Sequence, residues 1–368
     1  MSTVRTAFDP AQPIRVAPGG HHACRLCAGG CRSYDVLLTE REARRLDSAW
    51  WRPLLHNVPE DAPLVTTDPA TQQYTLNRVE DRCVFLDADN LCIIHKAAGS
   101  DAKPLACQIF PLHAVQTPAG LNISLNVSCR RLVEMDVADP LLDPDEARRL
   151  LVQTQAIAVL GEMVTITPTL DLPYADYGTL RDQVAAILTV PAADWQQTGQ
   201  QWQAAATLLL TLEGAESPAD SRTLFRAAAQ SAQPGVPLRS TLTALYRRSV
   251  PWLTVLSDPA AALNFRAAQA AGLPLTFFAS IAGQWLAGDQ IALHRTARSG
   301  WVALLAAFVG GMQQASRIVP EGGQSAAIAL NEATASAVDF WLSPAGQIAL
   351  TEPNQQAFLH ELAALTAR

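Results

Sequence analysis

The pattern of apolar and polar positions along the chain changes near residue 136. Before that point, short apolar runs alternate with turn residues, which is typical of small strands joined by loops. The turn at residues 87–90 lies between two such runs, so the sequence predicts a β-hairpin over residues 82–95. The runs that indicate strands cover residues 34–39, 73–79, 82–87 and 91–95.

A second β-hairpin is predicted over residues 112–129, with its turn at Pro118-Ala119-Gly120. Its return strand alternates strictly between apolar and polar residues, so the two kinds of side chain face opposite ways. The apolar set comprises Leu121, Ile123, Leu125 and Val127, and the polar set comprises Asn122, Ser124, Asn126 and Ser128.

Helix signals begin with Thr39 and Glu42, which form a capping box and predict a helix over residues 39–46. Asp143 as a cap, with Pro144 in the first helical position, predicts a second helix. The apolar face of that helix comprises Ala147, Leu150, Leu151, Thr154, Ile157 and Ala158. Further helices are predicted at about residues 178–189, 196–213, 220–232, 237–255, 258–271, 276–288, 298–316, 325–342 and 353–366.

Composition and charge narrow the class of protein. The chain has 368 residues, 49% of them hydrophobic, which suits one large domain or two ordinary ones. Residues 1–135 carry 14 basic and 14 acidic side chains, so the net charge of −7 arises after them. Nucleic-acid binding needs a concentrated basic surface, and we expect no such partner. The sequence shows neither a signal peptide nor an apolar run that could cross a membrane, so we expect a soluble, cytoplasmic protein without a membrane partner.

All seven cysteines lie in the first 129 residues. In a reducing compartment, cysteines at short spacings favour a metal site or redox chemistry over disulfides. The C-x2-C pair at Cys24 and Cys27 lets a tight turn direct two thiolates at one ion, and Gly29 and Gly30 let the loop direct backbone N–H groups at sulfur. We predict seven metal ligands: Cys24, Cys27, Cys31, Cys83, Cys92, Cys107 and Cys129.

These residues resemble the YkgJ-like cysteine-cluster proteins, which are described as zinc- or iron-chelating. The match covers roughly residues 21–131, about a third of the chain. Its blocks are Cys24, Cys27 and Cys31, then Cys83-Val84-Phe85-Leu86, then Cys92-Ile93-Ile94, then Pro104-Leu105-Ala106-Cys107 with Phe110-Pro111. Departures from the family pattern occur where Arg32 replaces a second cysteine, and where His95, Lys103 and Gln108 replace Tyr, Arg and Arg.

The family also includes proteins similar to the flagellin lysine N-methylase. The resemblance therefore implies, as an alternative, an enzyme that uses S-adenosylmethionine and an iron–sulfur cluster to methylate lysines of a protein substrate. The sequence has no G-x-G-x-x-G loop between a strand and a helix, and it has no C-x3-C-x2-C run. The residues assign no catalytic group.

Several metal centres are compatible with seven thiols. One [4Fe–4S] cluster uses four, and two zinc ions use seven if one thiolate bridges them. A third arrangement pairs a four-thiolate site with a site of three thiolates and one imidazole from His21, His22, His95 or His113. We favour an iron–sulfur cluster, partly because of the methylase-like proteins in the family.

The expected fold is α+β and predominantly α, with a cysteine-rich metal-binding module at residues 1–135 joined to an α-helical domain at residues 136–368. The first functional hypothesis is a metal-binding protein of unknown reaction. The alternatives are the protein lysine methyltransferase and a helical interaction scaffold in which zinc supplies folding energy.

Overall fold

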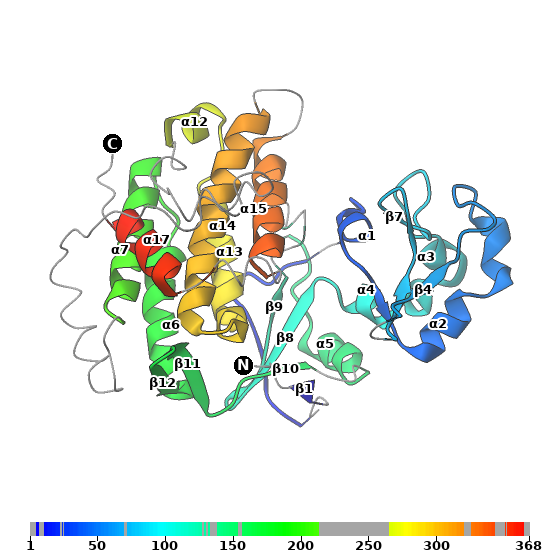
Figure 1. Cartoon of the computed structure of the whole chain (residues 1–368), viewed down its shortest axis with the longest axis horizontal. Helices are drawn as coiled ribbons and strands as arrows, with labels where there is room; N and C mark the ends of the chain where they lie inside the picture. The colour runs from blue at the N-terminus through cyan, green and yellow to red at the C-terminus, as the bar shows by residue number, and fades with distance from the viewer. Residues whose placement is uncertain are drawn as a thin grey trace.

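Figure 1 shows a computed structural model in which helices predominate over short strands. The predicted fold class, α+β and predominantly α, is confirmed. The structure describes residues 5–6, 11–22, 24, 26–69, 72–126, 129, 132, 138–153, 157–212, 265–319, 325–342, 350 and 352–363.

The longest helices lie together on the left of Figure 1 and form what we call the helical part. Helix α14 is buried along nearly all of its length and packs closely against α15. The two helices can approach because Gly311 has no Cβ atom, for which there would be no room beside Thr334. Trp202, Phe278 and Phe308 pack together at the centre of this core. Its elements are β11 (Met163–Thr167), β12 (Leu170–Pro173), α6 (Tyr174–Leu188), α7 (Trp195–Leu210), α12 (Phe265–Ala270), α13 (Thr276–Ala287), η4 (Gln290–Leu293), α14 (Ala297–Ile318), α15 (Ala326–Leu342) and α17 (Glu352–Ala363).

A five-stranded sheet lies beside the helical part, with the strand order β1-β10-β8-β9-β2. Its centre is the antiparallel hairpin of β8 and β9, to which β10 and β2 add as parallel strands. At the hairpin turn Gly120 has φ +123°, and a Cβ atom there would lie 2.5 Å from the Pro13 carbonyl oxygen, so the turn requires glycine. The elements are β1 (Arg5–Thr6), β2 (Ile14–Val16), β8 (Leu112–Thr117), β9 (Gly120–Leu125), β10 (Ile157–Val159) and the adjoining helix α5 (Pro144–Leu151).

The remaining elements, on the right of Figure 1, form what we call the cysteine-rich part, residues 24–110. They are short and surround a separate small core in which the Trp51 and Phe85 rings meet edge to face, 5.3 Å apart. The elements are α1 (Gly29–Ser33), β3 (Leu37–Leu38), α2 (Glu40–Leu46), η1 (Ala49–Leu54), β4 (Val65–Thr67), β5 (Tyr74–Leu76), β6 (Arg78–Val79), β7 (Arg82–Cys83), α3 (Ile93–Ala98), η2 (Ser100–Ala102) and α4 (Leu105–Ile109).

Several predicted elements are confirmed. Thr39 and Glu42 form both hydrogen bonds of the capping box at the start of α2, and Asp143 caps α5 with Pro144 in its first turn. The predicted hairpin forms between β8 and β9. Helices α6, α7, α13, α14, α15 and α17 lie where the helical pattern predicts them. The helices predicted at 220–232 and 237–255 lie outside the described residues, as does the first half of the one at 258–271, whose second half contains α12.

Three predictions about local structure are wrong. The predicted hairpin over residues 82–95 is reduced to one antiparallel bridge, between Leu86 and Cys92, across its turn. Strand β7 pairs instead with β6, through a turn at Glu80 and Asp81, both with positive φ. The run predicted as a strand at residues 91–95 contains only a single bridge at Cys92 and then starts helix α3. The helix predicted through residue 158 ends at Leu151, because residues 157–159 pair with β8 and β1 as a strand.

The hydrophobic cores include residues from both sides of the predicted boundary at residue 135, and the boundary itself stays a prediction. The core of the cysteine-rich part runs from Leu38 to Ile94. Leu125, Cys129 and Leu132 instead pack into the core of the helical part. The hairpin of β8 and β9 therefore belongs structurally with the residues that follow it. Among the helices that the structure describes, none has both the length and the hydropathy needed to cross a lipid bilayer.

Candidate metal centre

Six of the predicted ligands belong to the cysteine-rich part, and we call these six the cysteine cluster. Cys24 and Cys27 lie in the loop before α1, Cys31 lies in α1, Cys83 ends β7, Cys92 caps α3 and Cys107 lies in α4. Cys24 is exposed and the other five are half-buried. The structure describes all seven cysteines of the chain, and none of them forms a disulfide bond.

The loop that carries Cys24 and Cys27 has a constrained backbone. Leu26 and Ala28 have φ values of 51° and 57°, in the left-handed region that residues other than glycine rarely adopt. This path lets the Gly29 N–H donate a hydrogen bond to the Cys27 sulfur at 3.3 Å. The predicted orientation of a backbone N–H toward sulfur is confirmed at this position.

Two arginines connect the segments around Cys31. Arg78 donates a hydrogen bond to the carbonyl oxygen of Arg32, and Arg32 donates one to the Asn90 side chain at 2.5 Å. Helix α1 also packs against β7, which ends at Cys83. These contacts hold α1, β7 and the turn before Cys92 together, although the segments are far apart in sequence.

Helix α4, which carries Cys107, is attached by a carboxylate. The Leu105 N–H donates a hydrogen bond to Glu42 at 2.7 Å, so the residue that completes the capping box of α2 also holds the first turn of α4. Burial acts to raise the pKa of Glu42, but hydrogen bonds from the N–H groups of Leu105 and Thr39 outweigh it and lower the pKa. On the other side of α4, the Phe110 ring lies 5.7 Å from the Tyr34 ring.

The thiols of the cysteine cluster affect one another electrostatically. Burial raises the pKa of Cys31, and the neighbouring thiols of Cys92, Cys24 and Cys27 raise it further. Burial also raises the pKa of Cys83 to about 12, opposed by a hydrogen bond from the Phe85 N–H and reinforced by Cys31 and Cys92. Cys31 therefore has thiol neighbours in its own loop and on other segments.

Cys107 completes this set. Burial raises its pKa, and the thiols of Cys31, Cys83 and Cys92 raise it further. Each pair among Cys31, Cys83, Cys92 and Cys107 thus interacts electrostatically. These four thiols come from α1, β7, the start of α3 and α4.

Two cations act in the opposite direction. Lys103 lowers the pKa of both Cys31 and Cys107, and Arg78 lowers the pKa of Cys83. In the sequence Lys103 stands out only as a replacement for the arginine of the family pattern, and no motif identifies Arg78. The spacing of basic residues carries no signal for Arg78, since its role depends on how β6 packs against α1.

The chemistry of this donor set fits a metal centre bound by thiolates. Sulfur ligands with backbone N–H donors suit zinc and iron–sulfur clusters. Within the part of the chain that the structure describes, however, no three side chains of the His, Cys, Asp or Glu type are arranged to hold one ion. The thiols raise one another's pKa values, but they do not form a coordination sphere.

Cys129 has a different environment from the cysteine cluster. It is buried, with 7% of its surface exposed, and it packs in the core of the helical part. Its carbonyl oxygen accepts a hydrogen bond from the Asn331 side chain at 2.8 Å. The structure thus places six of the seven predicted ligands in one part of the fold and the seventh in the other.

The histidines considered as nitrogen ligands lie on separate elements. His21 Nδ1 is 2.8 Å from the carbonyl oxygen of Asp139, and His22 follows it beside residues 140–141. His95 is exposed on α3, and His113 pairs with Ser124 in the β8–β9 hairpin. The prediction that one of them completes the site stays untested.

Comparison of the chain with protein-family models, with curated proteins and with solved structures finds no match. The resemblance to the YkgJ-like cysteine-cluster proteins therefore stays a prediction from the residues quoted above.

Proposed function

We propose that this protein binds a metal centre through thiolates of the cysteine cluster. The observation that carries the proposal is the convergence of four segments on Cys31. Electrostatic interactions join its thiol to those of Cys83, Cys92 and Cys107. Hydrogen bonds from Arg78 and Arg32 connect α1, the β6–β7 hairpin and the turn before Cys92, and the bond from Leu105 to Glu42 attaches α4 to α2.

The four mutually interacting thiols are the primary ligand set in this proposal. Cys31, Cys83, Cys92 and Cys107 supply the number of sulfur atoms that one [4Fe–4S] cluster or one tetrahedral zinc ion requires. Cys24 and Cys27, which interact with Cys31, would complete a second or larger centre. A bound iron–sulfur cluster would supply electron transfer, and a bound zinc ion would supply folding energy or Lewis acidity.

The residues around the thiols have roles of their own. The Gly29 and Phe85 N–H groups donate hydrogen bonds to the sulfurs of Cys27 and Cys83, which stabilises the thiolate form that binds metal. Lys103 and Arg78 offset part of the negative charge that several thiolates would bring together. We assign the protein to the cytoplasm in this proposal, because free clustered thiols persist in a reducing compartment.

A zinc-stapled scaffold is the second candidate, and the size of the elements favours it. Strands in the cysteine-rich part have two or three residues, and its α-helices have five to seven. Elements this short bury little apolar surface, so domains of this kind depend on disulfides or metals for stability. The centre would then stabilise the fold rather than react.

The protein lysine methyltransferase is an alternative with no structural observation in its favour. It requires S-adenosylmethionine to bind, which calorimetry on the purified protein measures directly. Binding of this cofactor to a protein that also contains iron and sulfide would support the enzyme over the scaffold.

Anaerobic purification, followed by metal and sulfide analysis and an absorption spectrum, tests the main proposal. Iron with equimolar sulfide and a brown colour identifies a cluster, and colourless protein with bound zinc identifies the staple. If protein purified under these conditions contains neither metal above background, the proposal is wrong.

Substitution of cysteines tests the ligand set. We expect Cys31→Ser and Cys107→Ser to lose most of the metal, because both remove a thiol that interacts with at least three others. Cys129→Ala is the matched control, since it removes a thiol that packs in the helical core, and we expect it to keep its metal. Equal metal content in the three variants would contradict the assignment of Cys31 and Cys107.

A further inference from the structure

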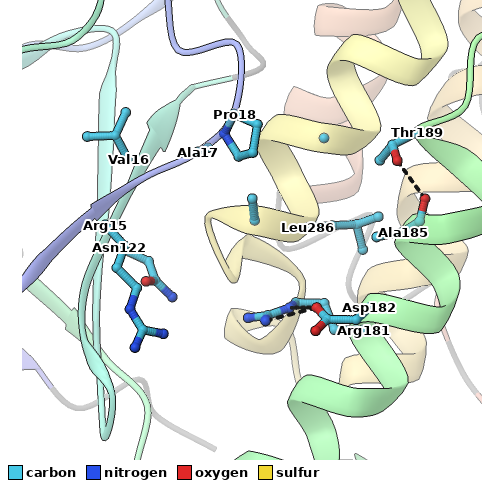
Figure 2. Close-up of a pocket in the computed structure, with 12 residues that line it drawn as sticks. Arg15, Val16, Ala17, Pro18, Asn122, Arg181, Asp182, Ala185, Thr189 and Leu286 are labelled. Atoms are coloured by element: carbon cyan, nitrogen blue, oxygen red, sulfur yellow. Dashed lines mark hydrogen bonds and ion pairs between the residues drawn. The ribbon is translucent and has the colours of Figure 1, made fainter.

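A cavity of about 340 Å³ lies between the five-stranded sheet and the helical part, and none of the cysteines lines it. Strands β2 and β9 form one wall, and helices α6 and α13 form the other, as Figure 2 shows. The volume falls in the range of pockets that hold metabolites and other small molecules. Much of the lining is apolar and comes from Val16, Ala17, Pro18, Ala185, Leu286 and Ala287.

The polar groups of the cavity include two arginines on facing walls. Arg15 and Asn122 are register partners in the parallel pair of β2 and β9, so their side chains project from the same face of the sheet. Arg181 reaches toward this face from α6 (Figure 2). Among the residues that the structure describes, Arg15 makes no ion pair, whereas Arg181 makes two.

Arg181 is held in place by a buried carboxylate. Its Nη1 lies 2.8 Å from Asp289, whose side chain has no exposed surface. Asn122 and Tyr174 donate further hydrogen bonds to the same carboxylate, at 2.6 and 2.7 Å. Asp289 itself has a left-handed backbone with φ 53°. A polar group fixed by its own layer of hydrogen bonds is characteristic of binding sites.

Ion pairing identifies the part of the cavity that is free to bind an anion. Asp289 and the exposed Asp182 both pair with Arg181, so these three groups together carry a net charge of −1. Among the described residues that line the cavity, Arg15 is the cation that pairs with no carboxylate. A guanidinium without a carboxylate partner, beside an apolar wall, complements an anion attached to an apolar group.

We propose that this cavity binds a small molecule with a carboxylate or phosphate group on an apolar body. The anion contacts Arg15, with the edge of Arg181 beside it. The apolar body packs against the wall formed by Pro18, Leu286 and Ala287.

Isothermal titration of the full-length protein with three probes tests this proposal. Benzoate and phenyl phosphate carry the two kinds of anion on the same ring, and benzamide is the neutral control. We expect saturable binding of at least one anion and much weaker binding of benzamide. Tighter binding of phenyl phosphate assigns phosphate as the natural group, and tighter binding of benzoate assigns carboxylate.

Two variants separate the charge from the cavity. Arg15→Gln removes the unpaired charge from an exposed position, so we expect an unchanged melting temperature and at least about tenfold weaker anion binding. Gly283→Met extends a side chain into the cavity from α13, where a Cβ atom meets only Thr189 at 3.9 Å, and we expect it to block the probes. Arg41→Gln is the matched control, because Arg41 is an exposed arginine in the cysteine-rich part.

The proposal is overturned if no probe binds the wild-type protein, or if benzamide binds as tightly as the anions. It is also overturned if Arg15→Gln and Arg41→Gln retain the same affinity for benzoate and phenyl phosphate. Loss of binding in Arg15→Gln alone, with the melting temperature preserved, supports it.

Discussion

Asp289 is the residue on which we expect a conservative substitution to have the largest effect on stability. Its carboxylate is fully buried between η4, α6 and β9. It accepts hydrogen bonds from Arg181 on one oxygen and from Asn122 and Tyr174 on the other. Burial, followed by the charge of Asp289, raises the pKa of Tyr174.

The substitution Asp289→Asn isolates the charge. Asparagine keeps the size of the side chain and is one of the few residues that tolerate a left-handed backbone, so the φ of 53° adds no new strain. The new amide places an NH2 group where the Oδ2 atom accepts two hydrogen bonds, so the Asn122 donor loses its acceptor. Removal of one partner from a buried ion pair costs about 3–5 kcal/mol. Because the Arg181 side chain is 19% exposed and reaches water, we expect about 3 kcal/mol, the lower end of that range.

Urea denaturation followed by tryptophan fluorescence measures this loss, since several tryptophans lie in the core of the helical part. Asp182→Asn is the matched control, because Asp182 pairs with the same arginine at 3.0 Å but its side chain is 71% exposed. An exposed ion pair contributes about 0–1 kcal/mol, so the control should change the free energy of unfolding little. Equal losses for the two variants, or a loss under about 1 kcal/mol for Asp289→Asn, would refute the reasoning.

Three further predictions concern stability. Burial lowers the pKa of His294 to about 4 from 6.5, so the unfolded chain takes up a proton first as the pH falls. The free energy of unfolding should therefore drop by about 3 kcal/mol between pH 6.5 and pH 4 in urea titrations. In His294→Gln this contribution to the pH dependence should be absent. Gly283→Ala should stabilise the protein by about 0.5–1 kcal/mol, because alanine restricts the unfolded chain and its Cβ atom has room in α13. Gly300→Ala should destabilise the protein, because its Cβ atom would lie 2.4 Å from the Ile291 carbonyl oxygen. The two variants should therefore shift the melting temperature in opposite directions. Glu42→Ala should cost about 1–2 kcal/mol by removing the acceptor for Leu105, against under about 0.5 kcal/mol for the exposed Glu40→Ala, and equal costs in urea denaturation would contradict the link between α2 and α4.

Local signals predicted the elements whose cause is local. The capping box of Thr39 and Glu42 and the cap at Asp143 are formed by side chains within three residues of each other, so the sequence contains their whole cause. The hairpin of β8 and β9 was predictable for a similar reason, since its turn needs glycine at residue 120. Long helices such as α14 were predictable from runs rich in alanine, glutamine and leucine between breaks marked by Pro, Gly or Asp.

The errors occur where a distant partner decides the conformation. Strand β10 has only three residues and exists because it pairs with β8, more than forty residues earlier, and with β1. Nothing in its own apolar run distinguishes it from the end of a helix. The turn between β6 and β7 uses Glu80 and Asp81 with positive φ and contains no glycine, so it lacks the usual hairpin signal.

The candidate sites differ in the same way. Cysteine spacing suggests candidate metal ligands because thiols are rare and those of this chain are clustered in the sequence. The sequence gives no comparable signal for the cavity lined by Arg15 and Arg181. Arg15, Arg181 and Asp289 are separated by more than a hundred residues each, and each reads as an ordinary surface charge in its own segment.

The two parts of the molecule use charged side chains for opposite purposes. In the helical part a large apolar core stabilises the fold, and the buried Asp289 holds Arg181 beside the cavity. In the cysteine-rich part the core is small, and long polar contacts such as those from Arg78 to Arg32 and from Leu105 to Glu42 hold the segments that carry the thiols. A metal bound by four of those segments would add the cross-links that the small core lacks. For this reason metal binding and folding of the cysteine-rich part should be one coupled equilibrium, whereas the cavity should form with or without metal.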